Sequence, residues 1–352
     1  MPSSNAAVNV GLVGFGLGGS TFHAPFIVRT PGLRLAAIVT ANPDRRRIAE
    51  AEYRDTTILA DVDALLASDV DCVAISTPNA THFPLARRAL EAGKHVVVDK
   101  PFAGTAAQAR ELGVLAARAG RIAVPFQNRR WDGDYLTLRK LIGDGRLGDV
   151  YRFESRFDRW RPIRKPGWQR ADANEAIENI VHDLATHLVD QALQLFGPVK
   201  SVHAELRRID PTIVSSDDMF LSLVHTSGVH SHLSSTMSAG VQGPRYHVYG
   251  TRASYVKHGV DVQEAQLRSG ARPGSFGYGE DPPAYWGTLG TGTGSEAVAT
   301  LKADYSPFYA GVAAAIRDGA PPPVSTESVI EQLSVIDACF ASAHGGQPVT
   351  PA

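Results

Sequence analysis

The first 125 residues alternate short apolar runs with longer stretches of helical periodicity, and this alternation constrains the fold more than any other feature. The apolar runs have the length and composition of buried strands, and several of the stretches between them end in glycine, as helices often do. Five runs are read as strands: "VNVGLVGFG" from Val8, "LRLAAIV" at 33–39, "DCVAIST" at 71–77, "HVVVDKP" at 95–101 and "RIAVPFQ" at 121–127. Because strands that alternate with helices form parallel sheets covered on both faces, we expect an α/β fold with a first domain at residues 1–125.

Residues 126–352 follow a different pattern and are assigned to a second domain. "DVYRFESRFDRW" at 149–160 alternates apolar and charged residues, as a half-exposed strand does. Further strand patterns, separated by short turns, follow at 200–209, 218–226, 229–238, 245–250 and 253–258. They predict an open, mostly antiparallel sheet with one face on a helix and the other facing water or a second subunit.

The end of the chain contains one irregular stretch and two helical ones. Residues 268–295 are rich in glycine, proline and serine and are expected to form a long excursion from the sheet. Helices are predicted at about 307–318 and 326–343, and the terminal helix can pack on either domain.

Composition excludes several classes of partner. The chain is 43% hydrophobic and 20% charged with a formal net charge of −1, so no nucleic-acid or membrane partner is expected. No apolar run approaches the roughly 18 residues of a membrane span. The two cysteines, Cys72 and Cys339, lie in apolar runs, which is typical of a reduced, cytoplasmic setting.

A glycine-rich loop follows the first strand. Gly14, Gly16 and Gly19 match G-x-G-x-x-G, with Phe15 and Leu17 between them, and the loop opens toward a helix. In this context glycines allow a tight turn and close approach of the backbone to the pyrophosphate of a dinucleotide. A purely structural glycine turn is the alternative.

The end of the second strand predicts which dinucleotide is bound. An acid at this point bonds the adenine ribose of NAD, but here Thr40 and Asn42 are neutral and three arginines follow from Arg45. This pattern favours NADP, whose ribose phosphate needs a cation. Asp44 keeps NAD possible, and a solvated basic start to the next helix is the structural alternative.

One segment carries a resemblance to a known family. In "AISTPNATHFPLARRALEAGKHVVVDKPF" (74–102) a strand ends in Ser76-Thr77-Pro78-Asn79 and leads to His82, and a Lys100-Pro101 step follows later. The segment resembles the glucose–fructose oxidoreductase/inositol dehydrogenase/MocA family, although the family usually has Glu where this chain has Asp99. The resemblance covers nearly the whole chain. It is closest to the NADP-dependent scyllo-inositol dehydrogenases, through "GFGLGGSTFHAPFI" (14–27), "FQNRRWDGDYLTL" (126–138), "HLVDQALQLFG" (187–197) and "ASYVKHGVDVQE" (253–264).

The resemblance implies a Rossmann domain and hydride transfer between a nicotinamide ring and a carbinol carbon of a sugar or cyclic polyol. Lys100 matches the family lysine that bonds the reacting hydroxyl, where a cation stabilises the developing alkoxide. The family also implies a homodimer or homotetramer joined through the open sheet. The expected cofactor contacts are Gly14, Phe15, Gly16, Leu17, Gly19, Thr40, Asn42, Arg45, Ser76, Thr77, Pro78, Asn79, His82, Asp99, Lys100 and Asn128.

The stretch "IVHDLATHLVDQALQLFG" (180–197) is predicted to be helical over 180–195. In a regular helix Asp183 and His187 lie about 40° apart around the axis, whereas His182 and His187 lie about 140° apart. The two histidines therefore do not share a metal ion, and no metal site is expected. Asp183 and His187 suit acid/base work and match the family's Asp-x-x-x-His motif, in which histidine takes the hydroxyl proton. His182 is interpreted as structural, with pocket lining as the alternative.

Four residues, together with Asn128, are candidates for contacts with a hydroxylated ring: Arg129, Trp131, Trp160 and Arg161. The family's glycine-rich loop before the helix is replaced by "ADANEAIEN" (171–179), and its Trp-Arg step becomes Trp168-Gln169, with Arg170 one place later. We therefore expect this loop, which contacts cofactor and substrate in the family, to be rebuilt in this chain, with a helix as one possible form. The alternative function is a non-catalytic dinucleotide-binding sensor of the same fold.

Overall fold

The computed structural model describes residues 7–163 and 179–352. The chain divides into two compact units. The first unit contains residues 1–128, 265–278 and 304–330, and the second contains 129–264, 279–303 and 331–352. The longest segment of the first unit ends close to the expected boundary at residue 125, but two later segments also belong to this unit.

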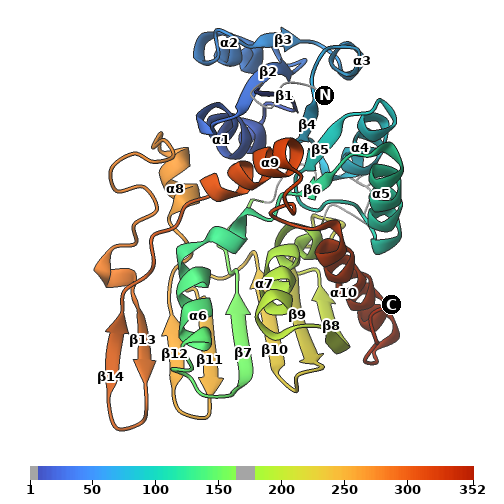
Figure 1. Ribbon diagram of the computed structural model, residues 1–352. Helices are drawn as coiled ribbons and strands as arrows, with labels where there is room; N and C mark the ends of the chain where they lie inside the picture. Colours follow the sequence, from blue (N-terminus) through green and yellow to red (C-terminus); the bar gives the residue numbers. More distant parts are fainter. Residues whose placement is uncertain (1–6, 164–178) are drawn as a thin grey trace. The chain divides into compact units, whose positions relative to one another are not determined.

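The first unit is built on a six-stranded parallel sheet with strand order β3-β2-β1-β4-β5-β6 (Figure 1). Successive residues along β1, β4 and β5 are almost all buried, so both faces of the sheet are covered, as the apolar runs predict. The strand order reverses at β1 and β4, the point at which sheets of this kind bind dinucleotides. The strands are β1 (Val8–Val13), β2 (Leu33–Val39), β3 (Thr57–Leu59), β4 (Cys72–Ile75), β5 (His95–Val98) and β6 (Ala123–Pro125).

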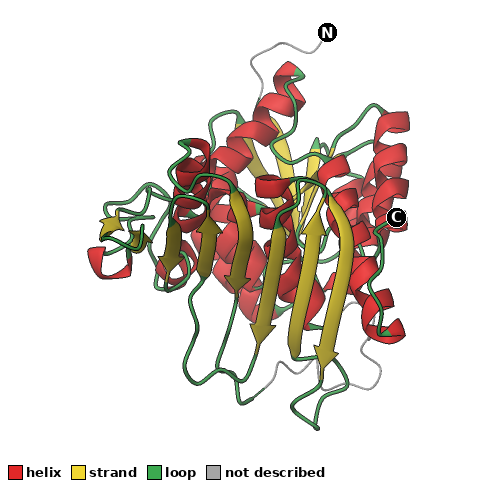
Figure 2. Ribbon diagram, turned by 90° about the horizontal axis from the view of Figure 1, so that it is seen from below, coloured by secondary structure: helices red, strands yellow, loops and turns green. Residues whose placement is uncertain are grey.

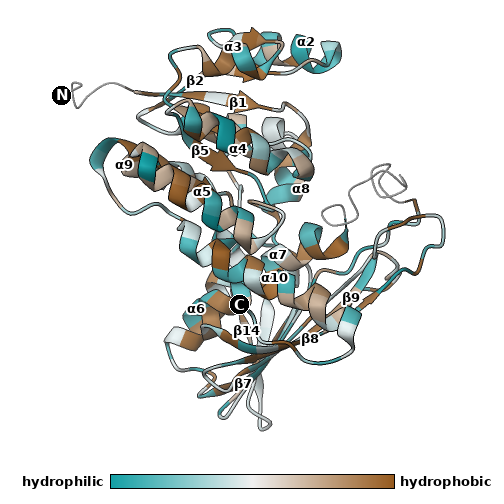
Figure 3. Cartoon of the chain, turned by 90° about the vertical axis from the view of Figure 1, so that its right-hand side faces the viewer, coloured by the Kyte–Doolittle hydropathy of each residue, from teal (hydrophilic) through white to brown (hydrophobic). Residues whose placement is uncertain are grey.

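Helices connect these strands, and their ends carry recognisable caps. The side chains of Asn42, Asp61 and Thr105 accept backbone N–H groups at the starts of three helices, and Gly120 ends one in the left-handed conformation. Figure 3 shows brown strands β1 and β5 beside the largely teal α2 and α4. The helices are α1 (Ala24–Arg29), preceded by a π-turn at Gly19–His23, α2 (Pro43–Glu52), α3 (Val62–Leu66), α4 (His82–Glu91), preceded by a 3₁₀ turn at Asn79–Thr81, α5 (Ala106–Ala119) and α9 (Ser306–Asp318).

The second unit is built on an eight-stranded sheet with order β14-β13-β12-β11-β7-β10-β9-β8. Every pair of neighbouring strands is antiparallel except β7 and β10, so the mostly antiparallel prediction is confirmed. The strands are β7 (Val150–Arg156), β8 (Val199–Arg207), β9 (Asp218–His225), β10 (His230–Thr236), β11 (Tyr246–Gly250), β12 (Ser254–Lys257), β13 (Gly287–Gly290) and β14 (Ser295–Val298).

The stretch expected to be an excursion, 268–295, is partly sheet. β13 pairs with β12, and β14 pairs with β13. The prediction missed these strands because each is only four residues long, which is too short to show a clear hydrophobic alternation. The part before them, 265–278, belongs to the first unit.

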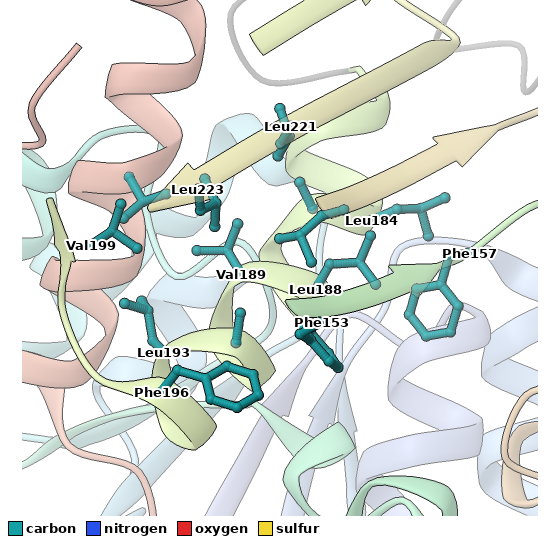
Figure 4. Packing of buried hydrophobic residues seen from close by; sticks show 14 of the residues in the cluster. Phe153, Phe157, Leu184, Leu188, Val189, Leu193, Phe196, Val199, Leu221 and Leu223 are labelled. Carbon is teal, nitrogen blue, oxygen red and sulfur yellow. The ribbon is translucent and has the colours of Figure 1, made fainter. Parts of the chain in front are cut away.

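The core of the second unit lies between one face of this sheet and its helices. Figure 4 shows Phe153 and Leu221 from the sheet packed with Leu184 and Leu188 from the helical segment. Figure 2 shows the strands of this sheet in front of its helices, so that the face of the sheet turned away from the core is toward the viewer. The remaining helices are α6 (Gly133–Gly143), α7 (Thr186–Phe196), α8 (Gln263–Arg268) and α10 (Thr326–Gly345), with 3₁₀ turns at Asn128–Trp131 and Pro283–Tyr285.

The helix expected at 180–195 begins with a π-turn at Val181–Ala185 and continues as α7. The N–H of Thr186 donates to the carbonyl of Val181, five residues back. The regular rotation of about 100° per residue therefore does not hold between His182 and His187, and the 140° separation is corrected toward a smaller angle. A π-turn has no signal in hydrophobic periodicity. Among the described helices, none is long and apolar enough to cross a membrane.

Candidate functional site

The glycine-rich loop connects β1 to the π-turn before α1, and two of its glycines are required by the turn itself. Gly14 has a φ of 94°, and a Cβ on it would lie 2.1 Å from the carbonyl oxygen of Ser76. A Cβ on Gly19 would lie 2.0 Å from the carbonyl oxygen of Gly14. Gly18, which the motif leaves out, is also crowded, because a Cβ there would lie 2.4 Å from Ser76 Oγ. The extra glycine in "GLGG" was the available signal.

The guanidinium of Arg45, at the start of α2, lies beside this loop. Asn42 caps the helix by accepting the N–H groups of Asp44 and Arg45, both at 3.0 Å. A Cβ on Gly16 would lie 3.5 Å from Arg45 Nη1, so the guanidinium stands beside the bare backbone of the loop. A bare backbone flanked by a guanidinium fits the phosphates of a dinucleotide.

The three arginines of α2 differ in their partners. Arg46 pairs with Glu50 at 2.9 Å, and Arg47 pairs with Asp44. Within the described part of the chain, no carboxylate pairs with the exposed Arg45. Thr40, the other neutral residue expected near the ribose, is buried at the end of β2, and its N–H donates to Leu59.

The segment after β4 is tied to the segment after β5 through His82. This histidine is 1% exposed, and its ring nitrogens lie 2.7 Å from the carbonyl oxygen of Pro101 and 2.8 Å from that of Thr77. Through these contacts His82 links the segment after β4 to the segment after β5. Thr77 is further held by a hydroxyl–hydroxyl contact of 2.6 Å with Thr81, beside Pro78 and Asn79.

Asp99 and Lys100 follow β5 directly. One carboxylate oxygen of Asp99 accepts the N–H of Lys100 at 2.8 Å, and the other accepts Ser76 Oγ at 3.0 Å. The Lys100–Pro101 peptide bond is cis. Burial alone would raise the pKa of Asp99, but the neighbouring His23, together with His82 and Lys100, outweighs it and lowers the pKa to about 2. Asp99 is therefore a carboxylate that anchors the backbone from which the Lys100 side chain leaves.

In the second unit, Asp183 lies in the π-turn and His187 in the first turn of α7. His187 is 5% exposed, and its ring stands edge-on to Phe157 with centroids 6.2 Å apart. The carboxylate of Asp183 lies 3.9 Å from Arg159 Nη1. Burial lowers the pKa of Arg159, and the charge of Asp183 opposes this shift. Arg159 was missed by the sequence prediction, since an arginine in a strand extension carries no distinguishing pattern.

His182 has the contacts of a structural residue. It is 1% exposed, its backbone N–H donates to Asn179 Oδ1 at 3.0 Å, and its ring is stacked on Phe340 with centroids 5.3 Å apart. These contacts support the structural interpretation of His182.

The proposed ring-binding residues have different surroundings. Arg129 pairs with Glu264 at 2.7 Å and with Asp132 at 3.3 Å, and its guanidinium lies over Phe157 at 5.0 Å. Trp160 is 61% exposed. Arg161 donates its N–H to Met237 at 2.9 Å. Trp131 ends the 3₁₀ turn that begins at Asn128, which belongs to the first unit.

The sequence predicts no metal site, and it predicts that the loop at 171–179 differs from the family's glycine-rich loop. Across residues 7–163 and 179–352, no three His, Cys, Asp or Glu side chains gather as metal ligands do. The glycine-free loop at 171–179 lies outside the described residues except for Asn179, as do Trp168, Gln169 and Arg170.

Comparison with known proteins decides the family. Residues 8–126 match the sequence model of an oxidoreductase family's NAD-binding Rossmann fold, and residues 139–350 match that of its C-terminal alpha/beta domain. The chain belongs to the GFO/IDH/MocA oxidoreductase family. The family resemblance found at residues 74–102 is thereby confirmed, and the protein is an NAD(P)-dependent oxidoreductase.

Members of the GFO/IDH/MocA family resemble this chain over nearly its whole length. It is 39% identical to the uncharacterized oxidoreductase YdgJ of Escherichia coli, over 96% of both chains. It is 30% identical to the scyllo-inositol 2-dehydrogenase (NADP(+)) IolW of Bacillus subtilis, over 95% of this chain and 93% of the relative. The crystal structure of an oxidoreductase from Bacillus cereus has a TM-score of 0.87 and 30% identity, and the match covers 98% of each chain.

Proposed function

We propose that this GFO/IDH/MocA oxidoreductase transfers a hydride between NADP and a carbinol carbon of a cyclic polyol or sugar that resembles scyllo-inositol. The observation that carries the proposal is the anchoring of Lys100, whose backbone is held by an ionised Asp99 beside the glycine-rich loop. The likeness to a scyllo-inositol 2-dehydrogenase that uses NADP(+) supports the substrate class.

Each catalytic candidate has a proposed role in this reaction. When bound, the nicotinamide supplies the hydride acceptor. Lys100 donates a hydrogen bond to the substrate oxygen and stabilises the negative charge that develops as the carbinol is oxidised. His187 takes the hydroxyl proton, and Asp183, one turn earlier, orients the ring or contacts the substrate. In the reverse direction His187 returns the proton to the alkoxide.

The choice of NADP follows from Arg45. Arg46 and Arg47 are already paired with carboxylates of their own helix, whereas Arg45 stands beside Gly16 without such a partner in the described chain. A guanidinium in this position binds the ribose phosphate of NADP, which NAD lacks.

Replacing Arg45 with alanine should therefore raise the KM for NADP about tenfold or more, the equivalent of about 1.4 kcal/mol. The KM for NAD should change by less than about twofold, because the lost partner is the extra phosphate. Initial rates with each cofactor at low salt measure both values, and Arg46→Ala and Arg47→Ala serve as matched controls. If all three substitutions changed the KM values for NADP and NAD equally, Arg45 would not be the residue that binds the ribose phosphate.

The open face of the eight-stranded sheet is where the protein assembles with copies of itself. Strand register aligns five side chains across this face: His247, Glu154, His232, Ser222 and His203. A face that carries acidic and basic groups together can pair with itself across a two-fold axis. Light scattering should give a mass of two or four times 37.6 kDa, and a monomer at micromolar concentration would contradict this assembly.

The proposed reaction is tested with purified protein, NADP and a panel of scyllo-inositol, myo-inositol, glucose and other sugars. We expect cofactor reduction with at least one cyclic polyol, and NADPH oxidation with the corresponding ketose. If the protein binds NADP but turns over no member of the panel in either direction, the sensor alternative is favoured.

A further inference from the structure

A polar chain lies in the interior of the first unit, between the π-turn after the glycine-rich loop and α9. His23 is fully buried, and its Nδ1 lies 2.6 Å from the hydroxyl of Tyr309, which is 1% exposed. Its Nε2 lies 3.5 Å from Asp99 Oδ2. The imidazole also packs against Phe126, with centroids 4.2 Å apart. The direction in which both ring nitrogens point is thus fixed by neighbours.

The surroundings of His23 select one tautomer. If Nδ1 carried the proton, the lone pair of Nε2 would face the carboxylate of Asp99, and the buried Tyr309 hydroxyl would have no recorded acceptor in the described structure. If Nε2 carries the proton, Tyr309 donates to Nδ1 and the Nε2–H points at Asp99. The second arrangement gives each of the three groups a complementary neighbour. At 3.5 Å from Asp99 Oδ2 the Nε2 atom does not yet make a hydrogen bond, and it has no hydrogen-bond partner elsewhere among the described residues.

Asp99 connects His23 to the backbone of Lys100. Its two oxygens already accept Ser76 Oγ and the N–H of Lys100. A Cβ on Gly18 would lie 3.0 Å from Asp99 Oδ2, so the carboxylate also lies directly against the glycine-rich loop. The gap of 3.5 Å to His23 is longer than a full hydrogen bond, and a shift of a few tenths of an ångström closes it. The position of Asp99, and with it that of the Lys100 backbone, therefore depends on where His23 directs its N–H.

We propose that His23, oriented by Tyr309, is a positioning residue that holds Asp99 and thereby sets where Lys100 meets the substrate hydroxyl. This inference rests on the proposed function of Lys100. It assigns roles to two buried residues of this chain that act through Asp99. The arrangement resembles other active sites in which a third group orients a histidine and the histidine orients the next residue.

Two substitutions of His23 separate the two contacts. In His23→Gln the side-chain amide reaches the place of Nε2 and can still donate to Asp99. In His23→Asn the shorter amide takes the place of Nδ1 and keeps only the contact with Tyr309. Tyr309→Phe keeps the ring and removes the hydroxyl that selects the tautomer. His95→Gln is the control, because His95 lies in the same unit outside the polar chain, where its Nδ1 accepts the backbone N–H of Ile122.

We expect kcat to fall about 100-fold in His23→Asn, and about tenfold or less in His23→Gln and Tyr309→Phe. The dissociation constant of NADP should change by less than about twofold in each, and His95→Gln should keep the wild-type kcat. Equal losses of kcat in His23→Asn and His23→Gln would overturn the proposal, as would losses that only follow thermal stability.

A second measurement remains decisive if the wild type turns over no polyol, in which case the proposed reaction fails separately. Nitrogen-15 spectra of histidine-labelled protein report which ring nitrogen of His23 is protonated. Protonation at Nε2 in the wild type, with loss of this preference in Tyr309→Phe, supports the polar chain. Protonation at Nδ1 alone overturns it.

Discussion

Replacing Lys100 with methionine should lower kcat/KM for the polyol about 10³-fold, while binding of NADP is far less affected. Methionine has nearly the length of lysine but neither its charge nor its hydrogen-bond donor. The loss corresponds to about 4 kcal/mol, the size expected when a positioned donor to a developing oxyanion is removed. Initial rates with the best polyol of the panel and a separate titration with NADP measure the two effects.

The control for this substitution lies at the other end of the same strand. Lys94 precedes β5, whereas Lys100 follows it, and Lys94 Nζ donates to the carbonyl of Ser68 at 2.9 Å. Lys94→Met should leave kcat/KM within about twofold of the wild type, because the lost bond lies at the amino end of the strand, away from the glycine-rich loop. A Lys100→Met protein that keeps its full rate would show that no carbinol oxygen is bound by this lysine.

Replacing His187 with asparagine should lower kcat about 10²- to 10⁴-fold, the range supplied by a positioned acid or base. The change removes the group that takes the hydroxyl proton but keeps a polar side chain in the same buried position. Asp183→Asn should have a smaller effect of about tenfold to 100-fold, because it disturbs the orientation of the base rather than removing it. Single-turnover rates separate this loss from any change in product release.

A buried histidine elsewhere in the second unit controls for general damage. The ring nitrogens of His225 lie 2.7 Å from the carbonyl of Gly197 and 2.8 Å from Ser231 Oγ, and burial lowers the pKa of His225. His225→Gln should reduce thermal stability and leave kcat unchanged. Partial recovery of His187→Asn by added imidazole would identify proton transfer as the lost step. A His187→Asn protein with wild-type kcat would remove this residue from the mechanism.

The sequence predicts the two sheets well because both depend on patterns that are local. Runs such as "HVVVDKP" are long and apolar enough to be recognised as buried strands. β3, at Thr57–Leu59, has one exposed and two half-exposed residues and was missed for that reason. The return of residues 265–278 and 304–330 to the first unit was also missed, since periodicity reports what lies beside a residue in sequence but not which unit it joins.

The residues of the candidate site that belong to a sequence motif were predicted. The residues that are placed there only by tertiary contacts were missed. Gly14 and Lys100 belong to recognisable motifs. His23, Tyr309 and Arg159 act through contacts with residues distant in the sequence, and a lone histidine, tyrosine or arginine has no spacing that marks such a contact. The π-turn before α7 is a further case, because its residues keep the apolar pattern of an ordinary helix.

In the proposed reaction hydrogen moves as hydride from a carbinol carbon to the nicotinamide, with Lys100 at the oxygen that remains. The most direct measurement uses the best polyol of the panel with deuterium at its carbinol carbons, unlabelled NADP, and NMR of the reduced cofactor. We expect one deuteron on the reduced nicotinamide ring and a slower reaction than with unlabelled polyol. Reduced cofactor without deuterium, or no reduced cofactor from any polyol at full occupancy of NADP, would contradict it.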